Sequence, residues 1–259
     1  MANLFLLCIA FIFGACIGSF LNVCIARLPA AESIVSPGSK CPACQSSIRF
    51  YDNIPILSYL WLRGRCRHCG RPISLRYPLV EILTGAMAAL IVLKFGLTID
   101  ALIYFILTSA LIVIIYIDLD HQLIPDVISL PGVAVGFGAA FFLDALTWTA
   151  SLVGILVGGG LLFAVAGGYY LLTGKEGMGG GDIKLLAMIG AFLGWQGVCF
   201  TIFVASLTGT LAGLMVMLIA GKNLKFAVPF GPFLSIGAIA YLFFGPQVIA
   251  WYFFGASLF

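Results

Sequence analysis

Charged side chains are scarce in this chain. Only 9% of its 259 residues are Asp, Glu, Lys or Arg, whereas 62% are hydrophobic. Soluble domains carry about 25% charged residues, so the composition excludes a water-soluble fold in practice. The net charge of +3 is small and does not indicate a nucleic-acid partner, and none is expected.

Histidine is scarcer still, with only His68 and His121 in the chain. Since His68 lies inside a Cys-x-x-Cys pair, neither a Ser/His/Asp triad nor a histidine-rich metalloprotease site can be assembled. The sequence also lacks a GxxxxGK[ST] phosphate-binding loop. No such catalytic set therefore competes with the carboxylates described below.

Long apolar runs are what the sequence has in abundance. Roughly 20 apolar residues are needed to cross a hydrocarbon core of about 30 Å. The expected fold is an all-α polytopic membrane protein with about eight transmembrane helices. Their expected ranges are residues 4–25, 79–96, 100–117, 125–146, 149–172, 183–195, 197–220 and 231–254.

The basic residues predict how these helices are oriented. No Lys or Arg precedes the first apolar run and basic residues follow it, which is the reverse of an export signal. The run is therefore expected to remain as a helix with its N-terminus outside. With eight helices in this orientation, all of the 13 lysines and arginines except Lys94 fall on or beside the cytoplasmic side.

Residues 27–78 form the only extended polar segment, expected as a cytoplasmic insert between the first two helices. Two Cys-x-x-Cys pairs in it, separated by 21 residues, match a tetrahedral zinc site with four thiolates: Cys41, Cys44, Cys66 and Cys69. Two disulfides are the alternative, and the reducing cytoplasm disfavours them.

The expected zinc is structural, because cysteine fills all four positions and leaves no open coordination site. A segment of about 50 residues also has too small a core to fold securely without such support. The chain is therefore divided into a first transmembrane helix (1–26), a four-cysteine zinc-binding insert (27–78) and a transmembrane domain (79–259).

Ionisable residues at membrane depth are costly and are functional candidates by default. On this topology they gather at the cytoplasmic ends of helices: Glu81, Asp118, Asp120, Asp126, Asp182 and Lys184. Each carboxylate also has an ordinary alternative. Asp182 would be an N-cap, Glu81 and Asp126 would complement positive helix ends, and the pair at 118 and 120 would be loop acids.

Taken together, the acids indicate a catalytic pair, Asp118 and Asp182. The run Gly179-Gly180-Gly181 is expected to let backbone approach backbone beside Asp182. Two carboxylates from separate helices then suit peptide hydrolysis, with one as general base and one as acid. The expected helix ends, together with Lys184, favour Asp182 as the base and Asp118 as the acid.

These residues resemble the type IV prepilin peptidases, which belong to the GxGD class of intramembrane aspartyl proteases. The resemblance covers nearly the whole chain. It rests on Gly18-Ser19-Phe20-Leu21-Asn22-Val23, the two cysteine pairs, Arg76-Tyr77-Pro78-Leu79-Val80-Glu81, the segment 118–126 and Gly179-Gly180-Gly181-Asp182-Ile183-Lys184. It implies that Asp118 and Asp182 are the catalytic aspartates and that 79–259 is the protease domain.

The resemblance further implies a bifunctional enzyme in the bacterial inner membrane, with its active site facing the cytoplasm. Such an enzyme removes the short basic leader of type IV prepilins or type II secretion pseudopilins. It then methylates the new N-terminus with S-adenosylmethionine. The alternatives are a carboxylate-coupled transporter and a non-catalytic zinc-containing scaffold of a secretion assembly. A transporter is disfavoured because none of the acids lies at mid-bilayer.

Overall fold

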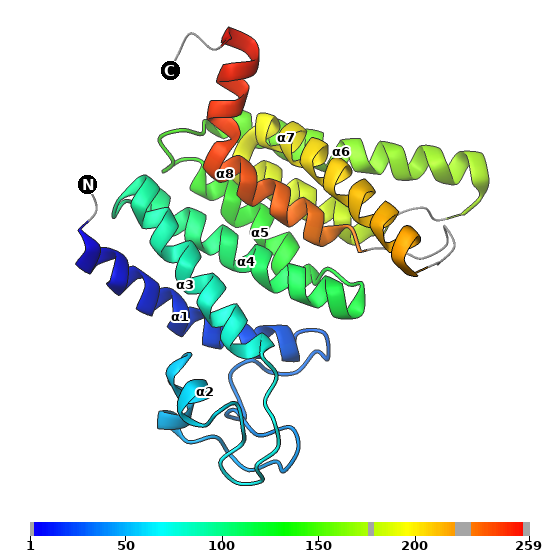
Figure 1. Cartoon of the computed structure of the whole chain (residues 1–259). Coiled ribbons are helices and arrows are strands. Elements are labelled where there is room, and N and C mark those ends of the chain that lie inside the picture. Colours follow the sequence, from blue (N-terminus) through cyan, green and yellow to red (C-terminus); the bar gives the residue numbers. More distant parts are fainter. Residues whose placement is uncertain (1–2, 176–178, 221–228, 256–259) are drawn as a thin grey trace. The chain divides into compact units, whose positions relative to one another are not determined.

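The computed structural model describes residues 3–175, 179–220 and 229–255, and the regular structure in these ranges is helical (Figure 1). Lys222, Lys225 and residues 176–178, which the sequence placed in cytoplasmic loops, lie outside the described residues. The helices are α1 (Leu4–Arg27), the short 3-10 helix η1 (Phe50–Asn53), α2 (Leu57–Trp61), α3 (Arg76–Phe95), α4 (Ile99–His121), α5 (Asp126–Ala139), α6 (Trp148–Thr173), α7 (Gly180–Ala220) and α8 (Gly231–Phe254).

Each of the eight expected apolar segments overlaps a helix, but fewer than eight of the described helices qualify as membrane spans. Among the described residues, six are long and apolar enough: α1, α3, α4, α6, α7 and α8. The shorter helix, α5, has 14 residues, or about 21 Å. Although its apolar run continues to residue 146, Pro131 and three glycines lower its helix propensity, and the helix ends at Ala139.

The number of candidate spans is also lower than expected because α7 is counted as a single span. Its 41 residues would extend about 60 Å as a straight helix, twice the thickness of a hydrocarbon core. Gly194 interrupts it with a φ of 70° and a ψ of 179°. α7 therefore comprises two helices that meet at Gly194 and correspond to the expected segments 183–195 and 197–220. The break lies where the sequence predicted the boundary.

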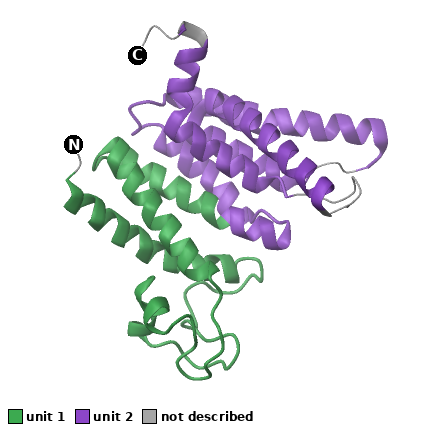
Figure 2. Ribbon diagram, in the orientation of Figure 1, with its two compact units in different colours: residues 1–113 green, residues 114–259 purple. Residues whose placement is uncertain are grey.

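The chain divides into two compact units, residues 1–113 and residues 114–259, which Figure 2 colours separately. The first unit contains α1, the polar insert, α3 and the larger part of α4. The second contains the last residues of α4 and all of α5 to α8. The four cysteines belong to the first unit, whereas Asp118 and Asp182 both belong to the second.

In the first unit, α1 packs along α3 through glycines. A Cβ atom at Gly14 would lie 2.6 Å from the Cβ of Ala88, and one at Gly18 would lie 2.8 Å from the Cα of Glu81. Apolar helices in a membrane associate largely through such close contacts between small residues, because lipid offers no hydrophobic driving force.

In the second unit, α7 is the central helix and packs against α5, α6 and α8. Its approach to α6 is the closest contact. A Cβ atom at Gly154 would overlap the carbonyl of Gly190, and one at Gly158 would lie 2.5 Å from the carbonyl oxygen of Leu186. The start of α7, which carries Asp182, is thus positioned by glycines on a neighbouring helix.

This packing predicts that Gly158→Ala destabilises the protein, whereas Gly160→Ala does not. A methyl group at position 158 has no room, but no atom lies within 4 Å of a Cβ at position 160. Overpacking costs about 1–3 kcal/mol, and it is measured by thermal unfolding of the purified protein in detergent. Equal melting temperatures for the two variants would contradict this account of the interface.

Candidate functional site

Four helix ends meet in the second unit. Lys184 near the start of α7 donates to both carboxylate oxygens of Asp126 at the start of α5, at 2.7 and 2.8 Å. Gly231, the first residue of α8, donates its backbone N–H to Asp118 near the end of α4. These contacts bring the expected site residues of α4, α5 and α7 to one end of this unit.

Asp118 is a buried carboxylate, with only 4% of its surface exposed. Its Oδ2 atom lies 3.0 Å from the backbone nitrogen of Gly231. The first N–H groups of any helix lack partners within the helix, so Asp118 provides the acceptor that the start of α8 needs. A Cβ at Gly231 would lie 2.6 Å from the same oxygen, so glycine makes this approach possible.

Asp182 is the third residue of α7 and is half-buried. The preceding Gly181 packs against Ile124, since a Cβ there would lie 3.0 Å from the Cβ of Ile124. The other side of Ile124 meets Gly231, where a Cβ would lie 3.2 Å from Ile124 Cδ1. Ile124 is therefore a common neighbour of the two segments, and Asp118 is close enough to act electrostatically on Asp182.

All three glycines of the run 179–181 were expected to allow a close approach of another segment beside Asp182. This is wrong for two of the three. A Cβ at Gly179 or Gly180 would meet no atom of the described residues within 4 Å, whereas Gly181 makes the close contact with Ile124. The backbone at this point needs only one small side chain, because the chain turns into the helix at Gly180 and presents a single residue to its neighbour.

Several ordinary alternatives for the acids can now be judged. Asp118 and Asp120 lie within α4 and are not loop acids, because the helix continues to His121. Asp182 lies in the first turn of α7 and is not its N-cap. Asp126 does occupy the positive end of α5, as the helix-end alternative predicts. Glu81 lies beyond the first turn of α3.

The contacts do not support the expected assignment of Asp182 as the base and Asp118 as the acid. Lys184 pairs with Asp126, so the expected tuning of Asp182 by this lysine is not observed. Asp118 lies at the C-terminal end of α4 but also contacts the N-terminus of α8. Since both aspartates meet a helix N-terminus, the helix-end argument no longer separates an acid from a base.

Gly231 was not identified from the sequence. Its local signal is Gly231-Pro232 directly before an apolar run, which is typical of a helix start with an unpartnered N–H. The acceptor of that N–H is Asp118, which is 113 residues away in the sequence. No local pattern therefore identifies it.

In the first unit, the four predicted cysteines form one cluster. Their sulfur atoms all lie within 4.8 Å of one another, with Cys41 and Cys69 separated by 3.9 Å and Cys44 and Cys66 by 4.0 Å. A zinc ion bound tetrahedrally with Zn–S bonds of about 2.3 Å separates its sulfurs by about 3.8 Å. The cysteines are not paired as disulfides, and the cluster can bind a zinc ion.

The two cysteine pairs share one backbone fold. Cys41 N–H donates to the Ser46 carbonyl, and Cys66 N–H donates to the Arg71 carbonyl, at 3.0 and 2.9 Å. In each turn, the residue directly after the second cysteine has a positive φ. These residues are Gln45 and Gly70. This repeat points both pairs of thiols at a common centre, as two zinc knuckles do.

Hydrogen bonds and neighbouring thiols shift the pKa values of the cysteines. Hydrogen bonding with Ser46 lowers the pKa of Cys44 to about 6. A hydrogen bond from the Arg71 backbone lowers the pKa of Cys69, but desolvation and the neighbouring thiols outweigh it and raise the value to about 11. Four thiols that share protons in this way suit a divalent cation, which binds thiolates and releases those protons.

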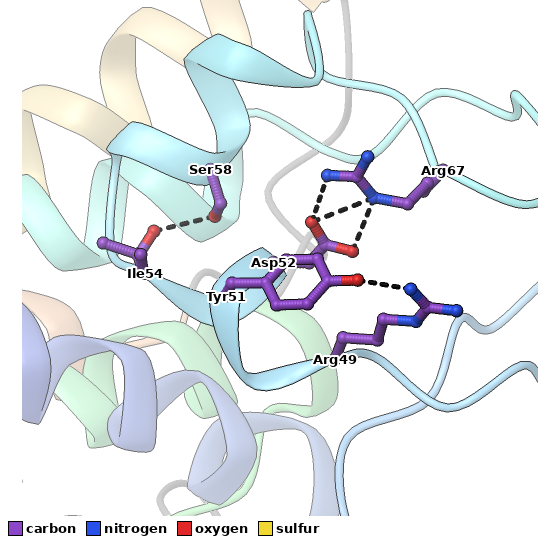
Figure 3. Close-up of polar contacts among 6 residues, drawn as sticks. All are labelled: Arg49, Tyr51, Asp52, Ile54, Ser58 and Arg67. Atoms are coloured by element: carbon purple, nitrogen blue, oxygen red, sulfur yellow. Dashed lines mark hydrogen bonds and ion pairs between the residues drawn. The ribbon is translucent and has the colours of Figure 1, made fainter.

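An ion pair ties the second cysteine pair to the middle of the insert (Figure 3). Arg67, which lies between Cys66 and Cys69, donates from Nε and Nη2 to the Asp52 carboxylate at 2.6 to 3.1 Å. These hydrogen bonds lower the pKa of Asp52. Beside the pair, Arg49 donates to the Tyr51 hydroxyl.

Glu81 joins α3 to the insert and belongs to the first unit, whereas Asp118 belongs to the second. Its Oε2 atom accepts the backbone N–H of Ile56 at 2.8 Å, and the residue is 8% exposed. Gly64, in the same insert, has a φ of 66°, and a Cβ there would meet the Tyr59 hydroxyl at 2.7 Å. A turn conformation that favours glycine therefore explains this residue.

Comparison with known proteins identifies relatives along most of the chain. The family model described as the Bacterial Peptidase A24 N-terminal domain matches residues 12–95, and the one described as the Type IV leader peptidase family matches residues 105–214. The comparison with solved structures found no significant match.

Among curated proteins, several named Prepilin leader peptidase/N-methyltransferase are similar to this chain. The one from Aeromonas hydrophila is 37% identical, over 94% of this chain and 92% of the relative. Those from Pseudomonas putida and Pseudomonas aeruginosa are 35% and 38% identical, each over 96% of this chain and over 94% and 93% of the relative. On this similarity, the chain belongs to the type IV leader peptidase family.

Proposed function

We propose that this protein hydrolyses the leader peptide of type IV prepilins or type II secretion pseudopilins, with Asp118 and Asp182 as its catalytic residues. The observation that carries the proposal is that the segments bearing two carboxylates from different helices both pack against Ile124. One is buried and oriented by the backbone of Gly231. The membership in the leader peptidase family gives the reaction class.

The chemistry needs one ionised and one protonated carboxyl group. The ionised group takes a proton from water while the water oxygen attacks the scissile carbonyl carbon, and the protonated group donates to the carbonyl oxygen. A proton then passes to the leaving amine as the C–N bond breaks. Two interacting carboxylates titrate as a pair, so the pair holds the one proton that both roles require.

The site faces the cytoplasm and the N-terminus lies outside, in the inner membrane of a bacterium. The support is the distribution of basic residues together with the position of Asp118 at the end of an apolar helix. A substrate with an apolar helix and a basic leader fits this arrangement. Its helix enters the bilayer beside the enzyme, its leader stays in water, and the scissile bond lies at the depth of the aspartates.

The protein also methylates the N-terminus that cleavage exposes. The support is that its relatives are named N-methyltransferases. S-adenosylmethionine supplies a methyl group that passes from its sulfonium sulfur to the amine nitrogen, with release of S-adenosylhomocysteine and a proton. Zinc held by Cys41, Cys44, Cys66 and Cys69 is structural in this scheme. The support is that the four sulfur atoms lie within 4.8 Å of one another and that, among the described residues, this group contains only thiols.

Asp118→Asn and Asp182→Asn are each expected to abolish leader cleavage, because an amide neither accepts the water proton nor holds the shared one. Purified protein in detergent is incubated with a prepilin, and loss of the leader is followed by gel shift and mass spectrometry. Asp120→Asn, a change at an exposed position of the same helix, is the matched control. Cleavage retained by either of the first two variants refutes the pair.

Gly231→Ala is expected to slow leader cleavage by about 100-fold, since displacement of a catalytic group by about 1 Å has effects of that size. The added methyl group would lie 2.6 Å from Asp118 Oδ2 and displace the carboxylate or the start of α8. Gly180→Ala, where no atom of the described part of the chain lies within 4 Å, is the control and should cleave at the normal rate. Similar rates for both variants would show that Gly231 does not position Asp118.

The purified protein is expected to contain about one zinc ion per chain, since four thiolates complete one tetrahedral site. Cys41→Ser should lose most of this metal, because an alcohol is a poor replacement for a thiolate ligand. The control is Cys199→Ser, a change in the exposed part of α7. Elemental analysis by mass spectrometry measures the zinc, and equal zinc content in both variants would exclude the cysteine cluster as the site.

A further inference from the structure

The insert turns back toward the membrane-spanning helices at Ile56. The backbone N–H of this residue donates to Glu81 of α3, which lies five residues inside the start of that helix. Glu81 also lies against Gly18 of α1, which is nine residues before the end of its helix at Arg27. At the rise of an α-helix, Ile56 therefore lies roughly 7 to 14 Å inside the ends of two apolar spans.

The chain reaches this depth through a strained turn. Ile56 has a φ of 62° and a ψ of −52° directly before α2, and a positive φ costs free energy for a β-branched residue. Beside the turn, a groove of about 400 Å³ is lined by Asn53 and Pro55 of the insert and by Ser19 and Phe20 of α1. The segment that leads into α2 thus lies along the side of α1, within its apolar span.

One face of α2 is apolar and exposed, and we call it the outer face of α2. It consists of Leu57, Leu60 and Trp61, which have the i, i+3, i+4 spacing of one helix face and are 65%, 65% and 84% exposed. The helix is attached to the insert elsewhere, since the Tyr59 hydroxyl donates to the Ile73 carbonyl at 3.2 Å. Exposed apolar surface of this kind is typical of contacts with a membrane or with another protein.

The charges around the outer face favour a membrane. Residues 27–78 contain eight lysines and arginines but only two acids. One of these acids, Asp52, is paired with Arg67. Arg63 and Arg65, which follow α2 directly, are exposed. Segments that lie in a membrane interface combine Trp and Leu at the acyl chains with Arg at the headgroups, and basic clusters are attracted to anionic lipids.

We propose that the outer face of α2 is embedded in the membrane leaflet on the side of the insert, with anionic lipid headgroups at Arg63 and Arg65. The depth of Ile56, the exposure of the outer face and the basic charge of the insert carry the proposal, which does not depend on the reactions proposed above. Lipid then attaches the insert at a third point, besides its connections to α1 and α3. This attachment offsets the cost of the conformation at Ile56.

The test uses Trp61 as a fluorescent reporter in the full-length protein, reconstituted in lipid nanodiscs. Tryptophan occurs four times in the chain, so Trp148→Phe, Trp195→Phe and Trp251→Phe together leave Trp61 as the only one. Lipids with brominated acyl chains quench a tryptophan that touches them. Trp61 should lose most of its emission, and the loss should be largest for bromines about 5–10 Å below the headgroups.

Two further variants move the reporter after Trp61→Phe is added to the same background. Leu57→Trp, on the outer face, should be quenched as Trp61 is, and it repeats the test without relying on position 61. Ala43→Trp, at an exposed position in the first cysteine turn, is the matched control and should keep its emission. Lack of quenching at both outer-face positions would overturn the proposal, and so would equal quenching of the Ala43→Trp control.

Lipid charge gives an independent readout of the basic residues. Quenching of Trp61 should be stronger in nanodiscs of phosphatidylglycerol than of phosphatidylcholine, and high salt should reduce the difference. Arg63→Gln combined with Arg65→Gln should remove the difference, whereas Lys175→Gln, at an exposed position outside the insert, should preserve it. Trp61 emission that responds to an added prepilin but to no brominated lipid would assign the outer face to a protein partner and overturn the proposal.

Discussion

Placing a carboxylate in hydrocarbon costs free energy, and the polar contacts of the helices reduce that cost. In the described helices, the acids Glu81, Asp118 and Asp126 lie within the first or last two turns, near backbone N–H groups and other polar atoms. Asp118 accepts the N–H of Gly231, Asp126 binds Lys184, and Glu81 accepts the N–H of Ile56. Each costly group is thereby satisfied, and each contact also joins two segments that are distant in the sequence.

Glycine makes these contacts possible by removing side-chain volume at chosen points. Gly18 lets α1 approach α3 beside Glu81, and Gly158 lets α6 approach α7. At the proposed catalytic site, Gly181 and Gly231 both pack against Ile124. Because association in lipid depends on close packing between helices, the glycines that stabilise the second unit also determine how near its two aspartates come.

The insert is stabilised by other interactions than the helices are. It is too short for a stable hydrophobic core of its own, and it exposes large side chains such as Phe50 and Trp61. Its order comes from two repeated cysteine turns, the ion pair of Asp52 with Arg67, and the contact of Ile56 with Glu81. Metal binding at the cysteines would thus stabilise the insert.

The sequence alone determined the helical class, the apolar segments, the four-cysteine cluster and the residues around which a site is built. Composition and local spacing carry that information, because a bilayer requires long apolar helices and a metal requires its ligands at set intervals. Only the tertiary structure decided that Lys184 binds Asp126, that Gly231 orients Asp118 and that Glu81 binds the backbone of Ile56. These contacts join residues tens of positions apart, so they depend on how helices pack, and no local pattern encodes them.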